Sequence, residues 1–207
     1  MIDPLTPMLL VVFSAVIYCW HLYKVRGHRD LRILIAVFMP IAIIIEFIGV
    51  YSGAYEYIWR NYLLNSIFVA FGWISNIYPN MHVAMMLIEG KNYYRKKTIP
   101  IRRNIMIGFL TGIFAVLYDL FLDPIAVHLG IWTWNVPTHW YGAPLGNFIG
   151  WWLIAFSSTS TYILLAYPNR KYRLELWIPI MVIIDIVFIV LMLGVFGQIL
   201  TLMLAGP

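Results

Sequence analysis

The stretch that decides the fold runs from Asn104 to Asp123 and reads NIMIGFLTGIFAVLYDLFLD. It has the length of one bilayer crossing, for which a helix needs about 20 residues. Its only charged side chains, Asp119 and Asp123, come at its end. A run of this length and composition predicts a transmembrane helix with two carboxyl groups close to one membrane surface.

The rest of the chain has the same character. Of its 207 residues, 62% are hydrophobic and 11% are charged, and the mean hydropathy is +0.83. This composition is typical of an integral membrane protein, and it excludes a soluble nucleotide-binding, DNA-binding or catalytic module. We expect a single integral membrane domain over residues 1–207. The apolar runs lie at 5–22, 31–50, 62–88, 104–122, 144–167 and 174–204.

These runs predict an all-α fold, a polytopic transmembrane helix bundle of six spans, or seven if a further short segment is counted, with aromatic-rich outer loops. The third run contains Pro79, where we expect a kink. The last run is longer than one bilayer requires, so it must tilt, break near Gly194 and Gly197, or project.

Basic residues indicate the orientation. The loops after the first, third and fifth runs carry four, six and three Lys or Arg, which leaves only Arg60 of the 14 elsewhere. The positive-inside rule therefore predicts that the loops at 23–32, 89–103 and 168–174 are cytoplasmic, and that both termini lie outside the cell membrane. The net charge of +5 is then explained by topology and anionic lipid, with no nucleic acid as partner.

Glycines at intervals of four predict close helix packing. Small residues at this spacing let two backbones approach each other in lipid. The two sets are Gly108 with Gly112, and Gly142 with Gly146 and Gly150.

Three carboxyl groups are predicted at one depth, in the outer third of the membrane. They are Glu46, Asp119 and Asp123, and Asn147 joins them from the next span. A carboxylate at the bilayer midplane costs about 2.5–3.5 kcal/mol, so such residues are functional by default. Asp123 has a second interpretation, because Asp-Pro is also a good start for a short helix, with Pro124 at its first position.

The segments after two of these carboxyls repeat one spacing. Each carboxyl is followed seven residues later by glycine, and then by aromatic residues two and four positions further on. Alternating aromatics place their rings on one side of an extended segment, so each segment is predicted to lay an aromatic face over the outer end of the bundle. The residues are Glu46, Gly53, Tyr55 and Tyr57 in one copy, and Asp123, Gly130, Trp132 and Trp134 in the other.

Metal and Schiff-base chemistry are not predicted. His128 and His139 are eleven residues apart and form no pair that shares a helix face, and no lysine lies within an apolar run.

The order of residues in two blocks resembles a known family. The longer block contains Asp119-Leu-Phe-Leu-Asp123-Pro124, Gly130-Ile-Trp132-Thr-Trp134 and Tyr141-Gly-Ala-Pro144-Leu-Gly-Asn147, and the shorter contains Glu46-Phe-Ile-Gly49 and Tyr55-x-Tyr57. Together they resemble the signature of the membrane-bound carotenoid biosynthesis proteins, which include carotenoid hydratases. The resemblance implies addition of water to a C=C bond of an isoprenoid, with a membrane-embedded carotenoid or polyprenoid as the partner.

The predicted pocket suits that chemistry. Hydration of a trisubstituted alkene requires a proton donor, a stabilised tertiary carbocation and a positioned water. A carboxyl in an apolar site stays protonated and serves as a general acid, and aromatic faces stabilise a cation. We predict Asp119 or Glu46 as the acid and Asp123 as its partner, and no metal or other cofactor is required. The predicted catalytic residues are Glu46, Asp119, Asp123 and Asn147, and the predicted substrate-binding residues are Tyr55, Tyr57, Tyr118, Trp132, Trp134, Tyr141 and Trp151.

Two alternatives stay open at this point. A carotenoid end-group cyclase uses the same protonation but captures the cation with an internal alkene. A transport or pigment-binding protein instead uses the carboxyls as a ligand or proton path. Asp185 and the hydroxyls of residues 157–161 extend polarity deeper into the membrane and favour that second alternative.

Overall fold

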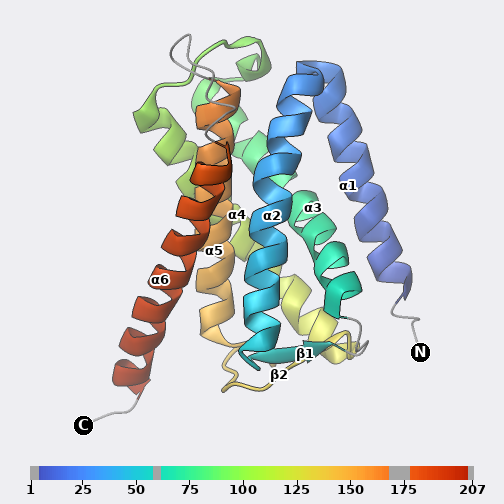
Figure 1. The fold of residues 1–207 in the computed structure, drawn as a ribbon, viewed down its shortest axis with the longest axis vertical. Helices are drawn as coiled ribbons and strands as arrows, with labels where there is room; N and C mark the ends of the chain where they lie inside the picture. Colours follow the sequence, from blue (N-terminus) through green and yellow to red (C-terminus); the bar gives the residue numbers. More distant parts are fainter. Residues whose placement is uncertain (1–4, 58–61, 168–177, 205–207) are drawn as a thin grey trace.

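The protein is an antiparallel bundle of long helices (Figure 1). Its computed structural model describes residues 5–57, 62–167 and 178–204. The short elements are the strands β1 (Tyr55–Tyr57) and β2 (Trp132–Trp134) and the 3₁₀-helix η1 (Tyr93–Arg95). The six long helices are α1 (Leu5–Arg26), α2 (His28–Tyr51), α3 (Tyr62–Glu89), α4 (Ile101–His128), α5 (Leu145–Ala166) and α6 (Ile178–Leu204).

The two ends of the bundle differ. At one end β1 and β2 pair antiparallel, with Tyr55 opposite Trp134 and Tyr57 opposite Trp132. We call this the sheet end, and α1 begins and α6 ends there (Figure 1). At the opposite end, which we call the basic end, lie the connections from α1 to α2 and from α3 to α4, with their lysines and arginines. The basic loop expected at 168–174 lies outside the described residues, as does Arg60.

Within the described residues four helices, α1, α2, α4 and α5, are long and apolar enough to cross a membrane. The chain is therefore a helical membrane protein, as its composition predicts. The sixth apolar run forms one continuous helix of 27 residues, with no break at Gly194 or Gly197. Pro79 lies inside α3, which continues to Glu89.

The short helix expected to begin at Asp123 does not exist, because α4 continues through Pro124 to His128. A proline inside a helix leaves the carbonyl four residues earlier without its usual N–H donor. That carbonyl belongs to Leu120, and the indole nitrogen of Trp140 donates to it over 3.0 Å. The helix therefore tolerates Pro124, and Asp123 is an interior residue of α4 and not the N-cap of a new helix.

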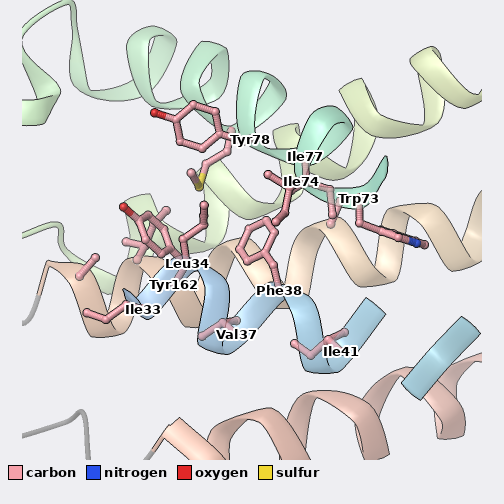
Figure 2. Close-up of a cluster of buried hydrophobic side chains, with 14 of the residues drawn as sticks. Ile33, Leu34, Val37, Phe38, Ile41, Trp73, Ile74, Ile77, Tyr78 and Tyr162 are labelled. Atoms are coloured by element: carbon pink, nitrogen blue, oxygen red, sulfur yellow. The ribbon is translucent and has the colours of Figure 1, made fainter. Parts of the chain in front are cut away.

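The apolar core is built around α2. In Figure 2 the buried face of α2 lies against α3 and α5. Phe38 meets the ring of Tyr162 edge-on, with their centroids 6.4 Å apart. Spacings of three and four residues place one face of a helix against its neighbours. The α2 residues on this face are Ile33, Leu34, Val37, Phe38 and Ile41, each at most 2% exposed.

One of the two glycine sets mediates close packing. A Cβ atom at Gly112 would lie 2.6 Å from Cδ1 of Trp152, and one at Gly108 would lie 3.0 Å from the carbonyl oxygen of Phe156, so α4 and α5 approach closely there. The prediction for the other set was wrong. Gly142 precedes α5 with φ of +91°, and a Cβ atom there would lie 3.0 Å from the Val127 side chain and not from a helix backbone. Among the described residues Gly146 has no neighbour within 4 Å of a Cβ atom, and Gly150 makes one ordinary contact.

Candidate active site at the sheet end

Asp119, Asp123 and Asn147 are in direct contact. Asp119 and Asp123 lie one turn apart on α4 and are 0% and 1% exposed. Asn147, near the start of α5, donates from Nδ2 to Oδ2 of Asp119 over 2.7 Å and to Oδ2 of Asp123 over 3.3 Å. One amide group therefore bridges the two carboxyls.

The two oxygens of Asp119 differ in their surroundings. Oδ2 accepts the bond from Asn147, whereas Oδ1 is buried and has no hydrogen-bond partner among the residues described. Asp123 is bonded on both oxygens: Trp132 Nε1 donates to Oδ1 over 2.6 Å, and Trp134 Nε1 donates to Oδ2 over 3.2 Å. Several N–H donors stabilise the ionised form of a carboxyl. The arrangement thus suits a carboxylate at Asp123 and a protonated acid at Asp119.

Glu46 on α2 is held by the other strand. The hydroxyls of Tyr55 and Tyr57 both donate to its Oε1, and the bond from Tyr55 measures 2.7 Å. Burial, and next the negative charge of Glu46, raise the pKa of both tyrosines well above the ordinary value. The hydroxyls therefore remain protonated and act as donors.

The repeated spacing in the sequence corresponds to a structural repeat. Glu46 and Asp123 are 77 residues apart, as are Gly53 and Gly130, and the strands β1 and β2. In both copies the helix ends with backbone hydrogen bonds between equivalent positions, and the glycine has a positive φ, +74° at Gly53 and +68° at Gly130. A glycine in this conformation is a common helix terminator. The strand that follows returns its two aromatic donors to the carboxyl of its own helix.

The two helix–strand units pair with each other through the sheet. Across the strands, the ring of Tyr55 lies 4.8 Å from that of Trp134, and the ring of Tyr57 lies 6.1 Å from that of Trp132. Glu46 and Asp123 therefore contact opposite strands of one small sheet. Asp119 breaks the repeat, because the position 77 residues earlier is Ala42, a buried residue of α2.

The remaining predicted site residues, Trp151, Tyr118 and Tyr141, make no hydrogen bond to the three carboxyls in the described part of the chain. Trp151, one turn along α5 from Asn147, stacks on Trp73 of α3 with centroids 4.0 Å apart. Tyr118 and Tyr141 are 50% and 75% exposed, and Tyr118 interacts electrostatically with Asp119, which follows it on α4.

Sequence reasoning missed Trp73. The sequence did contain a signal, because membrane tryptophans usually lie in belts at the membrane surface, whereas Trp73 lies well inside the apolar run at 62–88. In the structure it is the twelfth residue of α3 and only 6% exposed.

An apolar groove lies on the same two helices. It has a volume of about 370 Å³ and is open to the outside of the bundle. Its position places it within about one turn of Asp119 on α4 and of Asn147 on α5. The lining residues are Ile113, Val116, Leu117, Phe148, Ile149 and Trp152.

Comparison with known proteins identifies the family. The family described as carotenoid biosynthesis protein matches residues 6–206 of the chain. The match covers nearly the whole chain, so this protein belongs to the carotenoid biosynthesis protein family and has a role in carotenoid biosynthesis. No curated protein and no solved structure matches it.

Proposed function

We propose that this protein is a hydratase that adds water to a terminal C=C bond of an acyclic carotenoid or a related polyprenoid. One observation carries the proposal: Asp119 is fully buried, one of its oxygens is held by Asn147, and the other has no partner in the described part of the chain. A carboxyl group oriented in this way has one O–H that is free to protonate an alkene. Family membership supplies the class of substrate.

The structural repeat supports Asp119, and not Glu46, as the acid. Glu46 and Asp123 occupy equivalent positions and both hold the aromatic sheet. Asp119 has no counterpart in the first unit, where Ala42 stands. A carboxyl that is present in one unit only is not needed to build the sheet, and this favours a chemical role.

The reaction balances with these groups. Oδ1–H of Asp119 gives its proton to the less substituted carbon of the alkene, whose π electrons form the new C–H bond and leave a tertiary carbocation. A water molecule then forms the C–O bond, and its surplus proton returns to the Asp119 carboxylate. The sum is alkene plus water to tertiary alcohol, with the acid restored and no redox change.

The surroundings suit the cation and the substrate. Asp123 lies one turn from Asp119 and holds the indoles of Trp132 and Trp134, and an aromatic face stabilises a cation by about 0.5–2 kcal/mol. The groove between α4 and α5 offers an apolar surface to an isoprenoid chain that arrives from the bilayer.

We also infer six membrane crossings, with the sheet end outside the cell. The helix α3 has 28 residues and runs from the sheet end of the bundle, after β1, to the basic end, before α4, so it covers the same height as its neighbours. The helix α6, with 27 residues, covers this height in the opposite direction to α5. The basic end then faces the cytoplasm under the positive-inside rule. Water reaches the carboxyls from the nearer, outer surface.

The test is expression in cells that accumulate acyclic carotenoid precursors, followed by mass analysis of the pigments. We expect a product heavier by one water, and its loss in Asp119→Asn, which keeps the size and hydrogen bonding of the side chain but removes the proton. General acid catalysis typically contributes about 10²–10⁴-fold. Asn147 gives a second variant, because Asn147→Ala removes the bridge and should lower the yield without abolishing it.

Other outcomes discriminate between the alternatives. A product of unchanged mass with a cyclic end would identify a cyclase. Unaltered pigment with every precursor would contradict both reactions and favour transport or pigment binding.

A further inference from the structure

The proposed reaction needs a group that holds the water, and Asn147 does not have a donor to spare. Both of the bonds that its Nδ2 makes go to the carboxyls, one to Asp119 and one to Asp123. The indole nitrogens of Trp132 and Trp134 also donate to Asp123. The donors around the carboxyl pair are therefore already in use.

Trp73 supplies a donor that is not in use. Its side chain is 6% exposed, and its Nε1 has no acceptor within the described ranges. A buried N–H without an acceptor loses its bonds to water and gains none in return, so such groups are rare in native proteins and call for an explanation. The Nδ2 of Asn76 also lacks an acceptor in the part of the chain that the structure describes, but Asn76 lies one turn along α3 toward the basic end, so Trp73 is the donor closer to the sheet end.

The contacts of Trp73 place it about one turn deeper in the bundle than Asn147, which bridges the carboxyl pair. It stacks on Trp151 with an interplanar angle of 17°, and Trp151 lies one turn from Asn147 on α5. In Figure 2 the indole of Trp73 extends away from Tyr78, in the direction of the sheet end. The free N–H therefore points along the bundle toward the level of Asp119.

We propose, on the basis of the hydratase function above, that Trp73 holds the water that captures the carbocation. Its Nε1–H donates to the water oxygen, which leaves a lone pair on that oxygen for the new C–O bond. One water hydrogen stays in the product hydroxyl, and the other returns as a proton to the Asp119 carboxylate. Trp73 then acts after protonation and takes no part in it. Its loss should impair capture of the cation and leave its formation intact.

Reaction in D₂O separates the two steps. In D₂O the acid delivers a deuteron to the alkene carbon. A cation that is not captured then loses the original hydrogen of that carbon, or a hydrogen of a neighbouring carbon, to the Asp119 carboxylate, so the recovered alkene contains deuterium. The measurement is the ratio of hydrated product to deuterated alkene, for purified protein in lipid vesicles containing an acyclic carotenoid. We expect Trp73→Phe, which keeps an aromatic ring in the stack, to lower this ratio about tenfold while total deuterium uptake stays similar. Asp119→Asn should abolish both products.

Two control variants test the specificity of the effect. Trp151→Phe changes the same stack and should slow the reaction without changing the ratio. Trp20→Phe, at a tryptophan that is 60% exposed on α1, should change neither the rate nor the ratio.

Three results would overturn the proposal. An unchanged ratio in Trp73→Phe, with both products formed at the rate of the wild type, would show that another group holds the water. An unchanged ratio with a parallel fall of hydrated product and deuterated alkene would show that Trp73 only supports the fold. If the wild type forms neither product, the hydratase function itself fails, and the role of Trp73 fails with it.

Discussion

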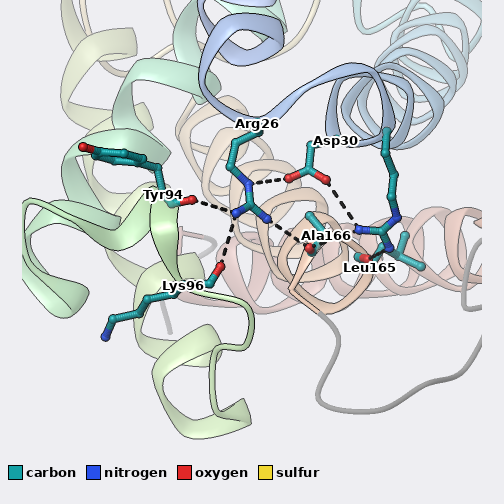
Figure 3. A network of polar contacts seen from close by, with 7 residues as sticks. Arg26, Asp30, Tyr94, Lys96, Leu165 and Ala166 are labelled. Atoms are coloured by element: carbon teal, nitrogen blue, oxygen red, sulfur yellow. Dashed lines mark hydrogen bonds and ion pairs between the residues drawn. The ribbon is translucent and has the colours of Figure 1, made fainter.

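Arg26 is a structural residue, although its position in a basic loop suggested only a role in topology. Its Nε donates to Asp30 over 2.5 Å, and its Nη1 and Nη2 donate to backbone carbonyls of Tyr94, over 2.7 Å, and Ala166, over 3.3 Å (Figure 3). It thereby joins α1 to α2, to the η1 segment and to the end of α5. Asp30 is 3% exposed, so this pair is largely removed from water.

Removing the guanidinium should be costly. Arg26→Ala leaves Asp30 with Arg29 at 3.5 Å and leaves the backbone carbonyls without their donor. Breaking a buried ion pair typically costs about 3–5 kcal/mol. We expect a clear fall in the unfolding temperature in detergent, followed by tryptophan fluorescence. Arg102→Ala, at an exposed position on the first turn of α4, should change the free energy of unfolding by less than about 1 kcal/mol. Equal effects of the two substitutions would contradict a special role for Arg26.

The candidate site was partly predictable residue by residue. A carboxyl in an apolar helix is costly, so the cost alone selected Glu46, Asp119 and Asp123. Which oxygen of Asp119 is free depends on where Asn147 lies across two helices, and no local pattern encodes that. Tyr118 adjoins Asp119 in sequence but is half exposed while Asp119 is buried, because neighbouring residues on a helix point in directions about 100° apart.

At the scale of elements, the contact between α4 and α5 fixes the distance between Asp119 and Asn147. Gly112 allows this contact, because a Cβ atom there would lie 3.0 Å from the carbonyl oxygen of Trp152 as well as against its ring. Gly112→Ala should force the helices apart and cost about 1–3 kcal/mol. Hydration should fall as well, because the bond from Asn147 to Asp119 lengthens.

Gly146 gives a matched control on α5. It is also a helical glycine, but a Cβ atom there would meet nothing within 4 Å. Gly146→Ala should therefore leave both the unfolding temperature and the product yield close to those of the wild type. A similar loss in both variants would show that helix separation is not the cause.

The strands illustrate what sequence can and cannot predict about an element. The repeated spacing of glycine and aromatics predicted two similar extended segments after α2 and α4. Their pairing was not predicted, because three residues are too few to carry a strand signal and an isolated two-stranded sheet is marginally stable. Here the aromatic side chains anchor each strand to a carboxyl of its own helix, to Glu46 from β1 and to Asp123 from β2.

At the scale of the whole molecule, the order of the apolar runs predicted the order of the helices closely. The run at 144–167 became α5, Leu145–Ala166, and the run at 31–50 became the greater part of α2, His28–Tyr51. The main difference is at the end of α4, which continues past residue 122 to His128, where the carbonyl of Leu120 finds a donor in Trp140. That donor lies 20 residues away in the sequence, beyond the reach of any local pattern.

The orientation in the membrane gives the last prediction. The lysines and arginines of the α1–α2 and α3–α4 connections lie at the basic end, opposite the carboxyls, so the positive-inside rule directs the sheet end outward. The test replaces Cys19, the single native cysteine, by serine and introduces one cysteine at an exposed position of either end, Thr133→Cys in β2 or Lys97→Cys after η1. We expect a membrane-impermeant thiol reagent to label Thr133→Cys in intact cells, and Lys97→Cys only after permeabilisation. The reverse pattern would place the carboxyl site on the cytoplasmic side, and the hydrating water would then have to come from the cytoplasm.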